Sequence, residues 1–243
     1  MLTEVVAHRG ASADLAEHTL AAYQLALEQG ATGLECDVRL TRDGELVCVH
    51  DRRVDRTSTG RGVVSVMTLS ELDELRWGDE DKPGVLRLES LLELLTPGVR
   101  LFVETKHPVR YGGLVEAKLV ALLARHSLAR PANKEESPIV VMSFSQQAVR
   151  RVQRHAPQLP TVMLSGTRLA PRIGDYAGPS IERLRADPTY VERAGRPVYC
   201  WTVDEPEDVL LCKRLGVRFV ATNKPAATLE VLRGTVPESE PSR

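Results

Sequence analysis

The most informative stretch of the chain is residues 33–60, which read GLECDVRLTRDGELVCVHDRRVDRTSTG. Two short apolar runs in it, Leu34–Val38 and Leu46–Val49, have the length and residue types of buried β-strands. Carboxylates interrupt the first run, and a histidine and an aspartate follow the second. Polar, chemically reactive side chains at strand ends are typical of (β/α)₈ barrels, in which the catalytic groups lie at the carboxyl ends of the strands.

The same alternation of short apolar runs and amphipathic helices continues along the chain. Further strands are predicted at Val5–Ala7, Leu101–Val103, Ile139–Met142, Thr161–Leu164, Val198–Trp201 and Arg218–Ala221. Helices are predicted at Thr19–Gln29, Ser70–Arg76, Leu88–Leu95, Gly113–His126, Gln146–His155, Glu205–Leu215 and Ala226–Arg233. Strands that alternate with helices favour parallel pairing. Eight such strands predict an α/β fold in the form of a closed TIM (β/α)₈ barrel.

The length of the chain suits one such barrel, since it has 243 residues and TIM barrels have about 250. We therefore predict a single domain over residues 1–233. Residues 51–87 are too long and too rich in charge for an ordinary connection. They are predicted to form a small insertion after the third strand, over the top of the barrel. Residues 234–243, GTVPESEPSR, are predicted to be a disordered tail.

Composition excludes several classes of partner. The net charge of −1 offers no broad basic face for nucleic acid. The chain contains no run of about 18 apolar residues, so no membrane span is predicted. Its start, MLTEVVAHRG, lacks the features of a signal peptide. The four cysteines match no zinc-site spacing and are predicted to be reduced, which favours the cytoplasm. A small-molecule partner is expected, and the oligomeric state cannot be predicted.

Three acidic residues predict a metal site. Glu35 and Asp37 are two apart on one strand, so their side chains point the same way. Glu104 follows the run Leu101–Val103. Three carboxylates that face one point repel one another unless a cation lies among them, and their hard oxygens suit Mg²⁺ or Ca²⁺. The alternative is that they are solvated surface acids, against which their apolar neighbours argue.

Two histidines and two cations complete a candidate catalytic set. His8 and His50 follow the first and third predicted strands. Histidine can accept or donate a proton near neutral pH. Cleavage of a phosphodiester needs one group to activate the nucleophile and one to protonate the leaving alkoxide. Arg9 and Lys106 can contact phosphate oxygens, or can instead pair with the acids. Trp201 is expected either to wall the pocket or to lie in the core.

Longer motifs make the chain resemble the glycerophosphodiester phosphodiesterase family. The resemblance extends from His8 to Pro225 and is carried by AHRGAS, the stretch at 33–60, FVETK, MSFS, CWTVDEPEDV and GVRFVATNKP. It implies a TIM barrel and cation-dependent hydrolysis of glycerophosphodiesters to glycerol 3-phosphate and an alcohol. By matching position it also implies roles for seven residues: metal ligation by Glu35, Asp37 and Glu104, acid–base catalysis by His8 and His50, and phosphate contacts from Arg9 and Lys106.

The chain departs from the usual family pattern at a few positions near these motifs. His18 and Asp204 stand where asparagine is usual, Asn223 stands where aspartate is usual, and Lys224 stands where arginine is usual. These changes leave the acids and both catalytic histidines in place. They therefore bear on substrate preference and not on the type of reaction.

Two other functions compete with this interpretation. One is a lysophospholipase D or sphingomyelinase D-like phosphodiesterase, whose lipid substrate needs an apolar slot that residues 51–87 could supply. The other is a non-catalytic barrel that senses phosphodiesters. Degenerate members of enzyme families normally lose ligands or bases, and none is lost here. The head-group alcohol, the identity of the ion and the division of labour between the two histidines are left open.

Overall fold

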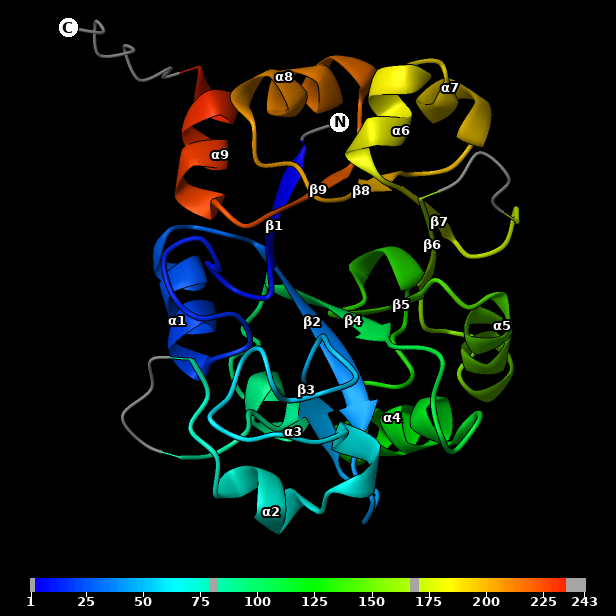
Figure 1. Ribbon diagram of the computed structural model, residues 1–243. Helices are drawn as coiled ribbons and strands as arrows, with labels where there is room; N and C mark the ends of the chain where they lie inside the picture. The colour runs from blue at the N-terminus through cyan, green and yellow to red at the C-terminus, as the bar shows by residue number, and fades with distance from the viewer. Residues whose placement is uncertain (1–2, 79–82, 167–170, 235–243) are drawn as a thin grey trace, which may run out of the picture.

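The computed structural model describes residues 3–78, 83–166 and 171–234 (Figure 1). Its strands are β1 (Glu4–His8), β2 (Gly33–Leu40), β3 (Leu46–Cys48), β4 (Arg100–Thr105), β5 (Ile139–Ser143), β6 (Thr161–Ser165), β7 (Tyr176–Pro179), β8 (Tyr199–Cys200) and β9 (Phe219–Thr222). Its α-helices are α1 (Leu20–Glu28), α2 (Leu69–Asp73), α3 (Leu88–Leu92), α4 (Leu114–Arg125), α5 (Gln146–His155), α6 (Ile181–Ala186), α7 (Tyr190–Ala194), α8 (Pro206–Leu215) and α9 (Pro225–Arg233). Short 3₁₀ helices lie at Val64–Val66 and Lys134–Glu136.

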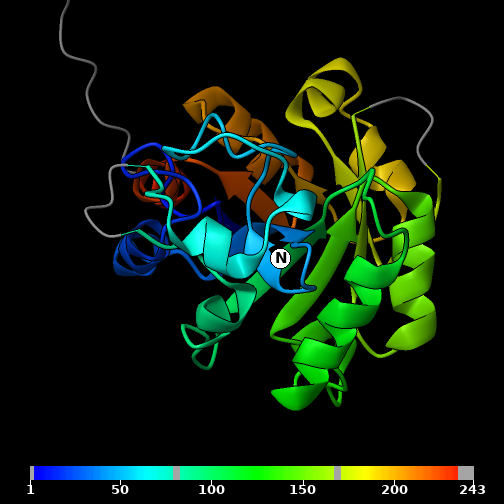
Figure 2. The same cartoon turned by 60° about the horizontal axis from the view of Figure 1, so that its bottom comes forward.

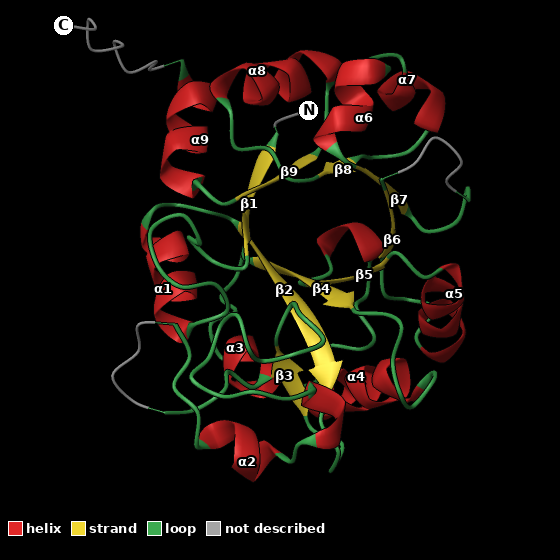
Figure 3. Cartoon of the chain, in the orientation of Figure 1, coloured by secondary structure: helices red, strands yellow, loops and turns green. Residues whose placement is uncertain are grey.

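Eight strands form the predicted parallel TIM barrel. They pair in the order β7-β6-β5-β4-β2-β1-β9-β8. Parallel bridges from Ala177 to Val198 and from Ser180 to Trp201 link the two ends of this series. Figure 3 shows the strands as a ring with helices around it. The predicted α/β barrel is confirmed, and the carboxyl ends of its parallel strands meet at one mouth.

One predicted barrel strand is wrong. The run at residues 46–49 contributes β3, which lies outside the ring and pairs antiparallel with β2, Val38 opposite Cys48. Only five residues, 41–45, separate the two strands, whereas a parallel crossover needs a dozen or more. Gly44, at φ +88°, and the Thr41 hydroxyl, which accepts the Glu45 N–H, form a tight turn instead. The Asp43-Gly44 dipeptide is the signal for this hairpin in the sequence.

The barrel strand that the sequence did not reveal is β7. It has four residues, Tyr176-Ala177-Gly178-Pro179, and all four are buried. Glycine and proline are depleted in strands, so the pattern argued against one. The short helices α6 and α7 that follow were missed as well. The other predicted helices are present with small shifts at their ends, and α3 is three residues shorter than predicted.

The segment between β2 and β4 lies beside the barrel mouth and has its own apolar cluster. Val47, Val49, Val54, Val64, Leu72, Trp77 and Val85 form it. Figure 2 shows this segment, with α2 and the loops drawn in cyan, crossing in front of the strands. Because β3 is part of it, the extra segment leaves the barrel after β2 and not after a third barrel strand. The boundaries 51–87 and the single domain over 1–233 stay predictions, and the predicted tail lies, beyond Gly234, outside the described residues.

Two apolar layers hold the barrel together. Inside the ring, aromatic and aliphatic side chains pack below the mouth, with the Phe102 and Phe219 rings 5.0 Å apart. Outside it, Cys36 and other strand residues pack against the helices. Glu35 and Asp37 therefore face the interior while Cys36 faces outward, as the alternation of a strand requires. Among the described residues, no helix combines the length and apolar character that a membrane crossing needs.

Candidate active site

The structure brings the three predicted acidic residues together at the barrel mouth. Parallel pairing of β2 with β4 sets Asp37 directly opposite Glu104, and Glu35 lies on the same face of β2 two residues earlier. All three side chains are buried, and one carboxylate oxygen from each lies within 4.8 Å of the others. Three hard oxygens at this spacing fit one Mg²⁺ or Ca²⁺ ion. The alternative of solvated surface acids is wrong.

Burial and mutual repulsion strongly perturb two of these acids. Removal from water, together with the charge of Asp37, raises the pKa of Glu104 to about 8 and the pKa of Glu35 well above its usual range. Burial also opposes ionisation of Asp37. A hydrogen bond from His18 and the charge of Lys106 outweigh that effect and hold the Asp37 pKa well below its usual range. One acid is thus stabilised as an anion, and the other two need positive charge before they ionise.

Arg9 and Lys106 supply positive charge beside the acids. The Lys106 Nζ lies 2.8 Å from Glu104 Oε1 and 3.2 Å from Asp37 Oδ1. The Arg9 Nε lies 3.1 Å from Asp37 Oδ2, a close charge contact without the alignment of a hydrogen bond. In the structure both cations pair with the carboxylates, which was the alternative role expected for them. Both side chains also line the site cavity, within reach of an incoming anion.

The turn after β1 places Arg9 by an unusual backbone conformation. Arg9 has φ +62°, and its N–H points at both the carbonyl oxygen and the Oε2 of Glu35, each 3.1 Å away. Gly10 follows at φ +86°, and a Cβ there would lie 2.7 Å from the backbone carbon of Ala22 in α1. No other residue type fits this approach without displacing α1. The His-Arg-Gly motif is therefore built around a close contact between turn and helix.

His8 is held by a partner from the far end of the chain. Its Nδ1 lies 2.8 Å from Asn223 Oδ1. Both the backbone N–H and the side-chain amide of Asn223 donate to the Asp204 carboxylate, at 2.7 and 2.6 Å. A carboxylate only accepts, so the amide oxygen of Asn223 must face His8, whose Nδ1 carries the proton. The free Nε2 then points toward the acids, 3.9 Å from Glu35 Oε2. Burial and the adjacent Arg9 lower the pKa of His8 to about 4.

His50 reaches the site from the loop after β3 and not from the end of a barrel strand. Its Nδ1 lies 2.8 Å from Asp51 Oδ1, and Arg56 donates to the other oxygen of Asp51 at 2.6 Å. That hydrogen bond from Arg56 lowers the Asp51 pKa to about 2, so a permanent anion backs His50. Burial lowers the pKa of His50, although the charge of Asp37 opposes that change. The two imidazoles therefore differ in their partners: an amide for His8 and a carboxylate for His50.

His18, expected from the sequence only to bear on substrate preference, lies against the acids. Its Nε2 lies 3.0 Å from Asp37 Oδ2, and its Nδ1 lies 2.8 Å from the Tyr23 hydroxyl. Tyr23 in turn donates to the carbonyl oxygen of Glu35 at 2.9 Å. His18 and Tyr23 thus fix the orientation of the carboxylate and of the strand that carries it. The only signal in the sequence was the departure from asparagine.

A cavity of about 130 Å³ opens above this cluster. Its polar side is formed by His8, Arg9, Glu35, His50, Glu104 and Lys106, and its apolar side by Met142, Phe144, Leu164, Tyr199 and Trp201. Trp201 lines the cavity, which is one of the two positions expected for it. It contacts Phe144 edge-on, with ring centroids 5.1 Å apart. No separate role was expected for Phe144 of the MSFS motif, whose side chain is exposed at the mouth.

Reactive groups converge here on a small polar cavity with an apolar wall at the barrel mouth, which defines the chain as a barrel enzyme. Comparison with known proteins agrees. The model of the glycerophosphoryl diester phosphodiesterase family matches residues 8–227. The chain is 53% identical over 247 residues to a Mycobacterium tuberculosis protein named probable glycerophosphodiester phosphodiesterase 1, covering 92% of this chain and 90% of that one. It is 31% identical to the glycerophosphodiester phosphodiesterase of Bacillus subtilis, covering 94% and 86%.

Solved structures show the same fold. The crystal structure of a glycerophosphodiester phosphodiesterase from Agrobacterium tumefaciens superposes with a TM-score of 0.77 at 27% identity, covering 96% of this chain and all of that one. An Oleispira antarctica phosphodiesterase, solved in complex with the product sn-glycerol 3-phosphate, has a TM-score of 0.82 at 23% identity and covers 96% and 97%. The chain belongs to the glycerophosphoryl diester phosphodiesterase family and is a phosphodiesterase.

Proposed function

We propose that this enzyme hydrolyses glycerophosphodiesters to glycerol 3-phosphate and an alcohol, with one divalent cation held by Glu35, Asp37 and Glu104. The observation that carries the proposal is the meeting of three buried carboxylates, within 4.8 Å of one another, beneath a cavity that the imidazoles of His8 and His50 line. The names of the relatives and the product bound to the Oleispira protein support the substrate class. When bound, the cation would neutralise and orient the phosphate.

The remaining contacts to phosphate fall to Arg9 and Lys106. Both cations line the cavity beside the acids, and each already contacts Asp37. A guanidinium offers a planar fork to two phosphate oxygens, and an ammonium offers a compact charge. We assign to Arg9 and Lys106 the non-bridging oxygens of the substrate. The Phe144 and Trp201 rings would cover the carbon skeleton of the glycerol and exclude water from it.

The partners of the two histidines suggest which is base and which is acid. His8 has a neutral amide partner and an unprotonated Nε2 that faces the acids, so it suits the base that deprotonates the nucleophile. That nucleophile is either a water or the 2-hydroxyl of the substrate. His50 has an ionised carboxylate behind it, which stabilises an imidazolium, so it suits the acid that protonates the leaving alcohol.

Turnover with defined ions tests the proposal. Glycerophosphoglycerol and glycerophosphocholine should each release glycerol 3-phosphate in the presence of Mg²⁺ or Ca²⁺, and a chelator should abolish the release. Each ion is assayed separately after exhaustive chelation, so that the two are compared on the same preparation. The absence of glycerol 3-phosphate with every ion would refute the proposed reaction.

Replacement of His18 should weaken the metal site without removing a ligand. His18→Ala deletes the imidazole that lies 3.0 Å from Asp37 Oδ2. The loss of a residue that orients a metal ligand typically reduces metal affinity about 10- to 100-fold. We therefore expect the ion concentration for half-maximal activity to rise by that factor, with kcat at saturating ion largely retained. His18→Asn, which keeps one donor, is the matched variant. Its ion requirement should lie between those of the wild type and His18→Ala. An unchanged ion requirement in His18→Ala would contradict this role.

The contact between Asp204 and Asn223 leads to a prediction about pH. Asn223→Asp would put a carboxylate beside His8 and raise the His8 pKa from its present value of about 4. A histidine base works only when it is neutral. As the solution is acidified, the variant would therefore lose activity at a higher pH than the wild type does. The double variant Asp204→Asn/Asn223→Asp exchanges the two groups and keeps one amide and one carboxylate in contact.

We expect the acidic limb of the kcat/KM profile to move upward in the double variant, with activity near the wild-type level at the plateau. Asn223→Leu removes the acceptor altogether and should lower kcat about 10- to 100-fold, the usual effect of losing a group that orients a functional imidazole. Thermal melting is the control for folding. An acidic limb that does not move would show that Asn223 leaves the protonation of His8 unaffected.

A further inference from the structure

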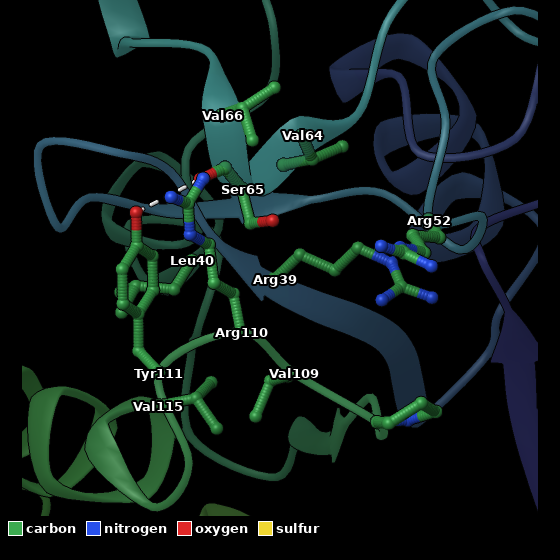
Figure 4. Close-up of a pocket in the computed structure, with 11 residues that line it drawn as sticks. Arg39, Leu40, Arg52, Val64, Ser65, Val66, Val109, Arg110, Tyr111 and Val115 are labelled. Atoms are coloured by element: carbon green, nitrogen blue, oxygen red, sulfur yellow. Dashed lines mark hydrogen bonds between the residues drawn. The ribbon is translucent and has the colours of Figure 1, made fainter.

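A second cavity adjoins the active site and is lined by three arginines. It has a volume of about 460 Å³ and lies between the end of β2, the 3₁₀ turn at Val64–Val66 and the loop after β4. Arg39, Arg52 and Arg110 line it, together with apolar side chains such as Val109. Figure 4 shows the three guanidinium groups among these apolar residues. None of the residues assigned to the reaction lines this space.

The cavity shares a wall with the active site. The Arg39 Nε and Nη2 donate to the carbonyl oxygen of His50 at 3.1 and 2.7 Å. Arg52 follows His50 by two residues, and Pro108 in the cavity wall follows Lys106 by two residues. A group attached to a phosphate held beside His50 and Lys106 would have to extend past this wall to enter the larger cavity. The 130 Å³ space above the acids offers less room for such a group.

Within the parts of the chain that the structure describes, no carboxylate forms a salt bridge with Arg39, Arg52 or Arg110. Figure 4 shows the Arg39 and Arg52 guanidinium groups on the same side of the cavity. Guanidinium groups that face one space repel one another, and an anion between them removes that repulsion.

The third arginine is held in place on another side of the cavity. The Arg110 guanidinium carbon lies 5.7 Å from the centre of the Tyr111 ring. The Tyr111 hydroxyl donates to the carbonyl oxygen of Ser65 at 3.0 Å, which ties the loop after β4 to the segment between β2 and β4. Arg110 is thus oriented by an aromatic face and lacks an acidic partner among the described residues. The same tie joins the two walls of the cavity.

We propose that this arginine cavity binds a second phosphate, carried by the head-group alcohol of the substrate. The inference rests on the proposed function and narrows it to glycerophosphodiesters whose alcohol is itself phosphorylated. Guanidinium groups recognise phosphate through paired, charge-assisted hydrogen bonds. The apolar side chains of the cavity would pack against the carbon ring or chain of the alcohol. An acyl chain, the alternative occupant, would leave three cations facing hydrocarbon.

Two substrates that differ only in the second phosphate test this inference. sn-Glycero-3-phosphoinositol 4-phosphate and sn-glycero-3-phosphoinositol are compared by kcat/KM in wild-type enzyme. We expect the phosphorylated substrate to be favoured about 10-fold or more, the scale of one hydrogen bond to a charged group. The preference should shrink as salt concentration rises. The ratio should fall toward one in the double variant Arg52→Gln/Arg110→Gln, and Arg61→Gln, an exposed arginine outside the cavity, should keep the wild-type ratio.

Direct binding separates this inference from the proposed reaction. Calorimetry with myo-inositol 4-phosphate and with myo-inositol reports on the cavity whether or not a diester is cleaved. We expect myo-inositol 4-phosphate to bind and myo-inositol not to bind. The double variant should lose the binding of myo-inositol 4-phosphate. Failure to release glycerol 3-phosphate from any diester would refute the reaction and leave the binding result standing. Equal rates on the two inositol substrates, or a preference that survives the double variant, would overturn the inference. Lysophosphatidylcholine cleaved 10-fold faster than glycerophosphocholine would overturn it in favour of an acyl chain.

Discussion

Alanine at either His8 or His50 is expected to lower kcat for glycerophosphodiesters by about 10²–10⁴-fold, the usual contribution of general acid–base catalysis. Both imidazoles line the cavity above the acids, and each is fixed by a hydrogen bond of 2.8 Å that its Nδ1 donates. His126→Ala is the matched control, since that histidine is exposed and bonds to Glu89 outside the cavity. It should retain full activity. Near-complete turnover in the His8→Ala/His50→Ala double variant would contradict the assignment.

The leaving group separates the two roles. The p-nitrophenyl ester of glycerol 3-phosphate releases a phenolate that needs no proton from the enzyme. If His50 is the acid, His50→Ala should recover most of its lost activity on this substrate. His8→Ala should remain impaired, because the nucleophile still needs a base. Recovery in His8→Ala instead would reverse the assignment, with His8 as acid and His50 as base.

Glu104→Gln is expected to abolish both the activity and the stabilisation by metal ions. The amide keeps the shape of the side chain and removes one of three carboxylates that lie within 4.8 Å. The loss of a metal's electrostatic contribution, several kcal/mol, corresponds to at least about 100-fold in rate. In wild-type enzyme an ion at about 100 times its Kd adds about 2.7 kcal/mol to the free energy of unfolding. In Glu104→Gln the melting temperature should no longer rise with Mg²⁺ or Ca²⁺, whereas in His50→Ala it still should.

Without metal, the stability of Glu104→Gln should also depend on pH differently from that of the wild type. The pKa of Glu104 is raised from 4.5 to about 8 by burial and by Asp37, so the folded state holds a proton that the unfolded state releases. Its contribution to the free energy of unfolding is therefore present below about pH 4.5 and is lost as pH rises toward 8. Glu104→Gln cannot ionise and should lose less stability over this window. An identical pH slope in chelated wild type and variant would show that Glu104 does not hold the proton.

Short-range patterns in the sequence predicted the parts of the site that depend on one strand or one helix. The period of two along β2 placed Glu35 and Asp37 on the interior face, and the helix pattern located α5 with both its ends. All four cysteines are free, which agrees with the prediction that they are reduced, and all four are buried. The cytoplasmic location and the roles of Arg9, Lys106 and Trp201 stay predictions.

What the sequence alone determined is the alternation of strands and helices and the set of reactive side chains at strand ends, because both depend on residues close together in the chain. The tertiary structure decided which runs enter the ring: the five-residue turn sent β3 back along β2, and β7 is a strand only because its neighbours supply partners. It also decided the partners of the site residues. Closure of the barrel sets β9 beside β1, so Asn223 meets His8 from 215 residues away. Hydrogen bonds over such a separation follow from the closed ring, and no local pattern encodes them.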